Sequence, residues 1–176
     1  MGNYKEIVTK AVIGKAKKTS SGDYLLNTEQ VPNTVLGCWV INHAFNGTNN
    51  NGSVLINGSF DVNVWYSYDG DSKTAVSTSK FNYTDQMNIR LKDNKTITNN
   101  NEIIVRSLKQ PTVSEVKIDN GAVKLSIEKE LGVEIVGDTK IKVSVEDDED
   151  DYEIITDEAE EVTDEVIAEI DEDYLD

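Results

Sequence analysis

Apolar residues alternate with polar ones through the stretch from Val54 to Tyr68. Successive side chains of a strand point to opposite faces of a sheet, so this period of two predicts one strand with one buried face. Gly58 lies in the apolar register and indicates a bulge or a close approach of the backbone. Trp65 interrupts the polar face, and we expect it to make a second packing contact rather than to bind a ligand.

Short apolar runs on both sides of this stretch predict further strands. Residues 35–43 are apolar at both parities, which is typical of a strand covered on both faces. The other expected strands are residues 4–18, 24–26, 75–83 with parity continuing to 91, 102–109, 113–118, and 123–131 with parity continuing to 145. Turns or loops are expected at residues 20–23, 46–52, 69–71, 93–101, 110–111 and 119–121. The fold class is therefore all-β, a single β-sandwich or barrel-like domain of about 8–10 strands.

The first expected strand, residues 4–18, is basic, with five lysines and one glutamate. Its apolar spacing fits a strand or a single helical turn. The strand is favoured because Ile, Val and Thr are concentrated there and Gly14 weakens a helix. A terminal strand that carries lysines is typical of a protected sheet edge.

Charge divides the chain into a body, residues 1–145, and an acidic tail, residues 146–176. The tail holds 18 of the 33 acidic residues and no lysine or arginine, which leaves the body with 15 acidic residues against 17 basic ones. This distribution indicates an acidic appendage on a nearly neutral domain. It argues against nucleic acid as a partner, because a phosphate backbone needs basic surface.

One apolar stripe runs through the tail at spacings of three and four residues. Such spacing predicts an amphipathic helix, although carboxylates four residues apart repel one another and make the helix marginal. A basic, partly apolar groove would favour it, as for a segment that folds on binding. The expected partner-binding residues are Ile155, Ala159, Val162, Val166, Ile170 and Tyr174.

No catalytic, cofactor-binding or metal-binding residues are predicted. Cys38 and His43 are the only cysteine and the only histidine, and their separation of five places them on opposite faces of one strand, so they cannot form a catalytic pair. We expect Cys38 to be an inert buried residue and His43 to be a strand-end residue hydrogen-bonded to a loop. A structural zinc site needs about four nitrogen or sulfur ligands, and nucleotide-binding and hydrolase motifs are absent from the sequence. The chain is thus expected to be no enzyme and to need no cofactor.

The beginning of the chain lacks the apolar segment of a secretory signal, and no apolar run is long enough to cross a bilayer. We therefore expect a protein made as a soluble cytoplasmic chain without membrane insertion.

Three motifs, LGCWVINH from Leu36, DVNVWYSYDGDSKTAV from Asp61 and VGDTKIKV from Val136, resemble the CotE family of outer spore coat morphogenetic proteins of endospore-forming bacteria. The resemblance extends from about Tyr4 to the acidic end of the chain. Where the family frequently has Pro-Asn-Cys, this chain has Pro-Thr-Val from Pro111, which removes the basis for a cross-linking cysteine there.

The resemblance implies a structural morphogenetic scaffold that is made in the mother-cell cytoplasm and then lies in the outer layer of the spore coat. It implies a homo-oligomer whose C-terminal region recruits other coat proteins and which assembles on the basement-layer coat scaffold. Self-assembly is then expected to use the N-terminal strand, with Ile7, Thr9, Ala11, Ile13 and Lys15.

A carbohydrate-binding or glycan-processing β-sandwich module is the alternative. Trp65, Tyr66 and Tyr68 lie near Asp61 and Asp69 in the sequence. A glycan site needs exposed rings and carboxylates in one cleft, but alternation places Trp65 on the face opposite to both tyrosines.

Overall fold

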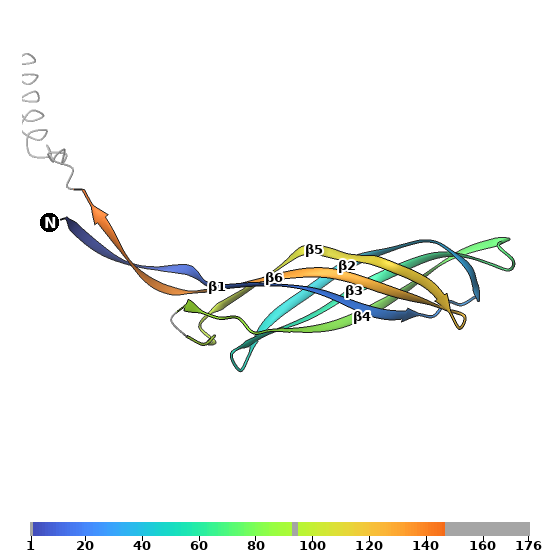
Figure 1. Ribbon diagram of the computed structural model, residues 1–176, viewed down its shortest axis with the longest axis horizontal. Helices are drawn as coiled ribbons and strands as arrows, with labels where there is room; N and C mark the ends of the chain where they lie inside the picture. The colour runs from blue at the N-terminus through green and yellow to red at the C-terminus, as the bar shows by residue number, and fades with distance from the viewer. Residues whose placement is uncertain (1, 93–94, 147–176) are drawn as a thin grey trace, which may run out of the picture. The chain divides into compact units, whose positions relative to one another are not determined.

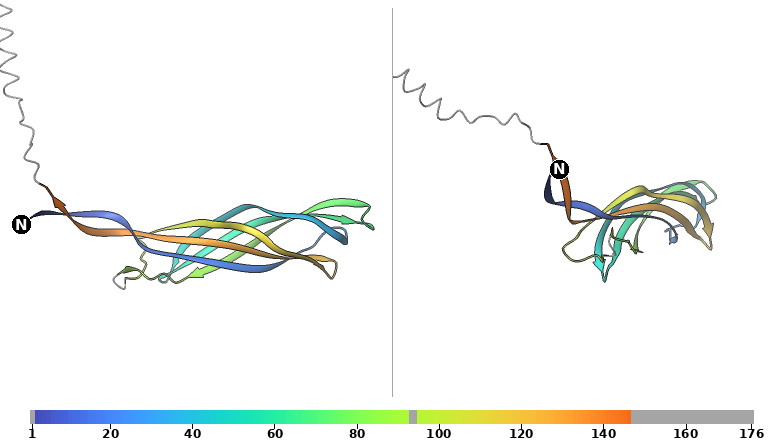
Figure 2. Two further views of the ribbon diagram at one scale, coloured as in Figure 1. Left: turned by 45° about the horizontal axis from the view of Figure 1, so that its top comes forward. Right: turned by 60° about the vertical axis from the view of Figure 1, so that its left-hand side comes forward.

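The computed structural model describes residues 2–92 and 95–146, which form six strands. The tail stripe from Ile155 to Tyr174 lies outside these residues. Two three-stranded sheets, with strand orders β1-β6-β5 and β2-β3-β4, face each other as two layers (Figure 1, Figure 2). The strands are β1 (Asn3–Leu26), β2 (Pro32–Asn50), β3 (Ser53–Tyr68), β4 (Lys73–Met87), β5 (Glu102–Asp119) and β6 (Ala122–Val145). The all-β sandwich predicted from the sequence is confirmed.

The chain divides into two compact units. Residues 8–140 form the larger unit, which contains the sandwich. Residues 1–7 and 141–176 form the smaller unit, of which residues 2–7 and 141–146 are described. The beginning of β1 and the end of β6 belong to the smaller unit.

The core lies between the two middle strands, β3 and β6. Each contributes every second residue to it, on the even positions of β3 and the odd positions of β6, as the alternation predicts. Burial of such side chains stabilises the fold by roughly 1.5–3 kcal/mol each. The central residues, none more than 2% exposed, are Val54, Ile56, Phe60, Val62, Val64, Tyr66, Val123, Leu125, Ile127, Leu131, Val133 and Ile135.

The described residues form fewer and longer strands than the predicted eight to ten, because several expected breaks lie inside strands. The turn expected at residues 20–23 is part of β1, and the loop expected at residues 46–52 shrinks to a turn at Asn51 and Gly52. Both turn residues have positive φ, 51° and 91°, as tight hairpins require. The hairpin turns expected at residues 69–71 and 119–121 are confirmed.

The break expected at Gln110 and Pro111 is a bulge inside β5. Lys109 pairs with Glu130 and Thr112 with Glu128, so Gln110 and Pro111 together lie opposite the single residue Lys129. A bulge accommodates proline because the extra residue does not need to donate to the ladder. Strand β5 therefore continues where the sequence predicted its end.

Gly58 reflects a close approach rather than a bulge. The β3–β4 ladder runs without a register shift from Val54 opposite Met87 to Tyr68 opposite Lys73, and Gly58 lies opposite Tyr83. A Cβ atom built on Gly58 would collide with the Tyr83 ring. The missing side chain therefore leaves the space that this ring occupies.

Replacement of Gly58 by alanine should lower the free energy of unfolding by about 1–3 kcal/mol, because the Tyr83 ring has to move in a packed interior. Denaturant unfolding measures the change. Gly37→Ala is the matched control, since a Cβ there would meet Trp39 and Trp65 at an ordinary 3.9 Å. Equal losses in the two variants would show that the space beside Gly58 is not special.

Candidate self-assembly surface

Strand β1 is the outermost strand of its sheet. It is hydrogen-bonded to β6 along one edge, and no strand of the described residues joins that sheet along the other edge. An unpaired edge presents backbone N–H and C=O groups that can pair with another chain. Residues 3–10 of this strand are exposed.

The five residues predicted for self-assembly do not share one environment. Ile7 is 42% exposed in the smaller unit, whereas the other four belong to the larger unit. Thr9 is exposed and Ala11 is half-buried. Ile13 packs against the core, and Lys15 forms an ion pair with Glu134. Of the five, Ile13 is the residue that packs against the core, whereas the Lys15 side chain stays 75% exposed despite its ion pair.

Gly14 is the first fully buried residue of β1. A Cβ atom on Gly14 would lie 2.5 Å from Leu91 Cδ2 and 3.1 Å from Ile89 Cγ2, so the segment after β4 packs closely against the strand here. The run of successive exposed residues in β1 ends before this point, at Lys10.

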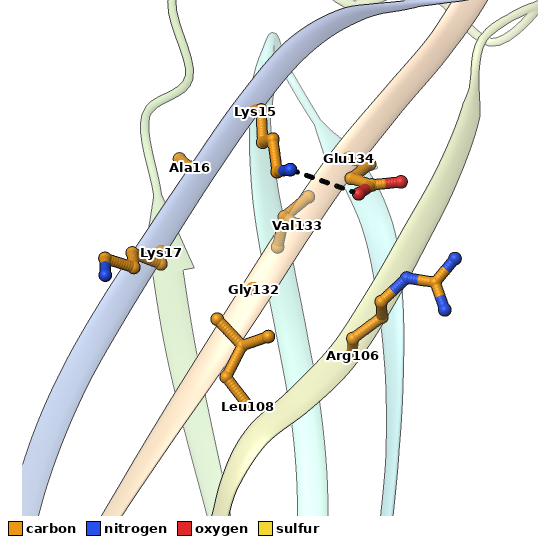
Figure 3. A pocket seen from close by; sticks show the side chains of 8 residues that line it. All are labelled: Lys15, Ala16, Lys17, Arg106, Leu108, Gly132, Val133 and Glu134. Atoms are coloured by element: carbon orange, nitrogen blue, oxygen red, sulfur yellow. Dashed lines mark ion pairs between the residues drawn. The ribbon is translucent and has the colours of Figure 1, made fainter.

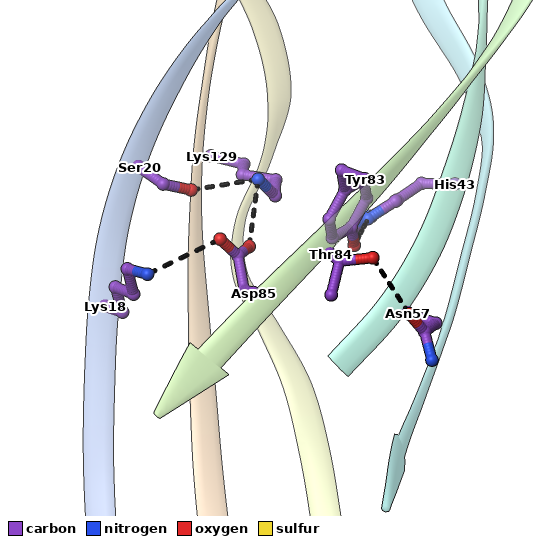
Figure 4. Close-up of polar contacts among 8 residues, drawn as sticks. All are labelled: Lys18, Ser20, His43, Asn57, Tyr83, Thr84, Asp85 and Lys129. Carbon is purple, nitrogen blue, oxygen red and sulfur yellow. Dashed lines mark hydrogen bonds and ion pairs between the residues drawn. The ribbon is translucent and has the colours of Figure 1, made fainter. Parts of the chain in front are cut away.

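A buried ion pair holds the remainder of β1 in place (Figure 4). Lys129 lies in the inward register of β6 and is 7% exposed. Its Nζ atom is 3.1 Å from Asp85 Oδ2 on β4 and donates to Ser20 Oγ on β1 at 2.9 Å. Lys18 Nζ on β1 lies 3.6 Å from the other oxygen of Asp85. One carboxylate thus joins β1, β4 and β6.

The ammonium group of Lys129 also lies over an aromatic ring. Its Nζ atom is 4.0 Å from the centroid of Tyr83, which adds a cation–π attraction inside the sandwich. A charge without such partners is costly in an interior of low dielectric constant.

The polar cluster continues from Tyr83 to β2 and β5. His43 Nε2 lies 2.6 Å from Tyr83 Oη, and His43 Nδ1 lies 3.2 Å from Gln110 Oε1. Because a carbonyl oxygen only accepts, Nδ1 carries the proton and Nε2 accepts from the Tyr83 hydroxyl. The bulge in β5 supplies Gln110 for this contact.

Burial favours the neutral forms of the Tyr83 hydroxyl and the His43 imidazole by shifting the pKa of each group. It raises the pKa of Tyr83 to about 12, with the nearby charge of Asp85 acting in the same direction. Burial and, to a smaller extent, the charge of Lys129 lower the pKa of His43, while the hydrogen bond to Gln110 opposes them. The His43–Tyr83 hydrogen bond therefore joins two neutral groups near neutral pH.

Two predictions about His43 are wrong. It is not a strand-end residue bonded to a loop, but lies within β2 and bridges to β4 and β5. A register shift between Ile41 and Ala44, where Asn42 has a φ of 55°, changes the parity of the strand, so Cys38 and His43 both face the interior. The Cys38 thiol is half-buried rather than buried as expected, and this burial raises its pKa. Its inertness stays a prediction.

Asp85 and Lys129 were not among the functional residues predicted from the sequence, although the sequence contains a pattern that indicates them. Asp85 lies at the same parity as Phe81, Tyr83 and Met87, and Lys129 lies between Ile127 and Leu131 in the inward register. One charge of each sign, each between apolar residues of its own strand face, indicates a buried pair.

The outer face of β2-β3-β4 carries two exposed indoles. Trp39 and Trp65 are each 44% exposed and lie on either side of Gly37. Tyr66 is buried and Tyr68 packs against the core, so the three rings considered for a glycan site do not share a surface.

Within the described part of the chain, no group of three or more His, Cys, Asp or Glu residues could hold a metal ion. The same residues include no helix long and apolar enough to span a membrane.

The two facing sheets and the buried cluster that joins them define an all-β sandwich domain. The chain belongs to the outer spore coat protein E (CotE) family, whose model matches residues 3–176. No curated protein and no solved structure gives a significant match. Family membership gives the chain a role in the spore coat and supports localisation there.

Removal of the carboxylate in Asp85→Ala should lower the free energy of unfolding by about 3–5 kcal/mol, because Lys129 is left as a buried charge without its partner. The double variant Asp85→Leu with Lys129→Met should recover most of this loss. Denaturant unfolding measures both variants. Glu128→Ala, which breaks the exposed pair with Lys109 at 3.5 Å, is the control and should cost less than about 1 kcal/mol. A double variant as unstable as Asp85→Ala would contradict the ion-pair explanation.

The lowered pKa of His43 also predicts a pH dependence. Its value lies below the ordinary 6.5 of the unfolded chain, so the unfolded state takes up the proton first as the pH falls. The contribution of His43 to stability is present above pH 6.5 and is lost as the pH falls toward the folded-state pKa. The stability difference between the parent and His43→Gln should therefore be larger at about pH 7.5 than at about pH 5. Urea unfolding of both proteins at each pH measures this difference, in which the pH-dependent contributions of the carboxylates common to both proteins cancel. A stability difference that is the same at both pH values would refute the predicted dependence on His43.

Proposed function

We propose that this protein is a structural morphogenetic scaffold of the spore coat, which assembles with copies of itself through the open edge of β1 and recruits other coat proteins through its acidic tail. The observation that carries the proposal is the position of β1 as an edge strand whose first residues are exposed. Family membership provides the spore-coat setting. In this setting the protein is made in the mother-cell cytoplasm and then assembles on the basement layer of the coat.

Strand addition explains how such an edge builds an assembly. A second chain that pairs with the open edge satisfies backbone groups that otherwise face water, and apolar side chains along the edge add affinity. Tyr4, Val8 and Val12 are 67%, 64% and 45% exposed, respectively, so β1 has apolar surface to contribute. If the contact joins two different surfaces, each added copy presents the edge again and the assembly propagates.

The role of the tail rests on its composition. Its 18 carboxylates attract basic partners, and the apolar stripe of residues 155–174 adds a specific contact. Partner proteins of the coat with basic, partly apolar grooves fit this segment. The stripe lies outside the described residues, so this part of the proposal rests on sequence pattern alone.

Removal of residues 2–9 should leave a folded body and abolish growth of the assembly with concentration. The truncation stops before Ile13 because that residue packs against the core. Light scattering across a concentration series measures particle mass, and circular dichroism checks the fold. Full-size assemblies from the truncated protein would place the contact elsewhere.

Point variants separate the edge from general surface effects. Val8→Asp and Val12→Asp place charge on the open edge and should reduce assembly severalfold. Trp65→Asp on β3 is the control, since Trp65 is 44% exposed and lies on the middle strand of the other sheet rather than on an edge strand. Equal effects of all three would indicate non-specific charge repulsion.

A further inference from the structure

A groove with an apolar floor crosses the sheet β1-β6-β5 (Figure 3). Its volume is about 530 Å³, and all three strands line it. Gly132 on β6 contributes no side chain, and Leu108 on β5 lies over it, 2.9 Å from the position that a Cβ atom would take. Leu108 is nevertheless 51% exposed, so its isobutyl group is available to a partner.

The charges around this groove are not balanced. Lys15 on β1 and Glu134 on β6 form an ion pair at 3.7 Å, so the only carboxylate in the groove lining has a partner. Lys17 and Arg106 also line the groove, and neither has an ion-pair partner among the residues that the structure describes. Figure 3 shows Lys17 on the β1 side and Arg106 on the β5 side of Gly132. An apolar contact flanked by two cations fits an acidic segment with apolar residues.

We propose that the groove binds the acidic segment, residues 147–176, of a second copy of this chain. Of the chain's 33 acidic residues, 17 lie in this segment, together with the apolar stripe from Ile155 to Tyr174. Lys17 and Arg106 attract the carboxylates, while Leu108 receives apolar residues of the stripe, with Val162 and Val166 at its centre.

This contact differs from strand addition at β1, although it rests on the proposed function in requiring that copies of the chain meet. It joins the end of one copy to the sheet face of another, so it is heterologous and can link successive copies. The groove and a partner protein would also compete for the same acidic segment, because a tail bound in the groove is not available to a partner protein.

Zero-length cross-linking of the full chain tests the proposal. A carbodiimide couples lysine amines to carboxylates in contact, and an equal mixture of ¹⁴N- and ¹⁵N-labelled protein distinguishes links between copies from links within a copy. We expect links between copies that join Lys15 or Lys17 to carboxylates of residues 157–173. Links confined to single copies, links to other lysines only, or no links would each overturn the proposal.

Variants identify the groove as the partner surface. Arg106→Glu should reduce the links between copies by about tenfold, whereas Lys117→Glu should not change them. Lys117 is a matched control because it is an exposed cation on the same strand outside the groove. Adding Glu161→Lys and Glu165→Lys to Arg106→Glu should restore the links between copies. If Arg106→Glu leaves the yield of links unchanged and the added substitutions do not raise it, binding of the acidic segment in the groove is refuted.

Two further variants test the apolar contact by itself and distinguish the groove contact from the β1 contact. Val166→Asp adds negative charge but removes an apolar residue of the stripe, so it should lower the yield of links if Leu108 receives the stripe. An unchanged yield would refute that apolar contact. The protein without residues 2–9 should retain the links between copies at high concentration even if it no longer grows into large particles. Loss of particle growth without loss of links would show that failure of the β1 contact and failure of the groove contact are distinct.

Discussion

The buried attraction between Lys129 and Asp85 is the interaction on which the rest of the sandwich depends. Two opposite charges on inward-facing positions can be tolerated only if they meet, and their meeting brings β4 and β6 from different sheets to one relative position. Lys18 and Ser20 attach β1 to the same pair. A one-residue slip of β6 would turn Glu128 or Glu130 inward in place of Lys129, so the pair opposes an incorrect register.

The polar cluster extends this constraint to all six strands. Tyr83 lies beside Lys129 on one side and binds His43 of β2 on the other, and His43 in turn binds Gln110 of β5. Strand β3 contributes space rather than a polar group, because the missing side chain of Gly58 leaves room for the Tyr83 ring. The two sheets are therefore joined by directional polar contacts as well as by apolar packing.

The sequence predicted the fold class and the two middle strands well because alternation over many residues reflects burial directly. In β3 and β6 the expected inward positions are those found in the core. It predicted strand ends less well, because local turn signals compete with the long-range ladder. Three expected breaks lie inside strands instead, because extended pairing or a bulge continues the strand there. They are Ser20 to Asp23, the polar residues before Asn51, and Pro111.

The candidate site was predictable only in part. Basic composition and β-branched residues placed Ile7, Thr9 and Ala11 on a terminal strand, but they did not show that Ile13 packs against the core. A bulge in β2 cannot be read from parity, so the shared inner face of Cys38 and His43 was missed. The groove around Leu108 depends on neighbours more than twenty residues away in sequence, such as Gly132, and no local pattern reveals it.

The uninterrupted run of β1 through 24 residues has a mechanical consequence. If copies join at the exposed beginning of β1 as proposed, tension along the strand axis loads the hydrogen bonds to β6 together in shear rather than one after another. Such a load would reach Lys18 and Ser20, and through them Asp85 and Lys129 in the interior. An outer layer built from such domains would resist stretching through the same charges that hold each domain together.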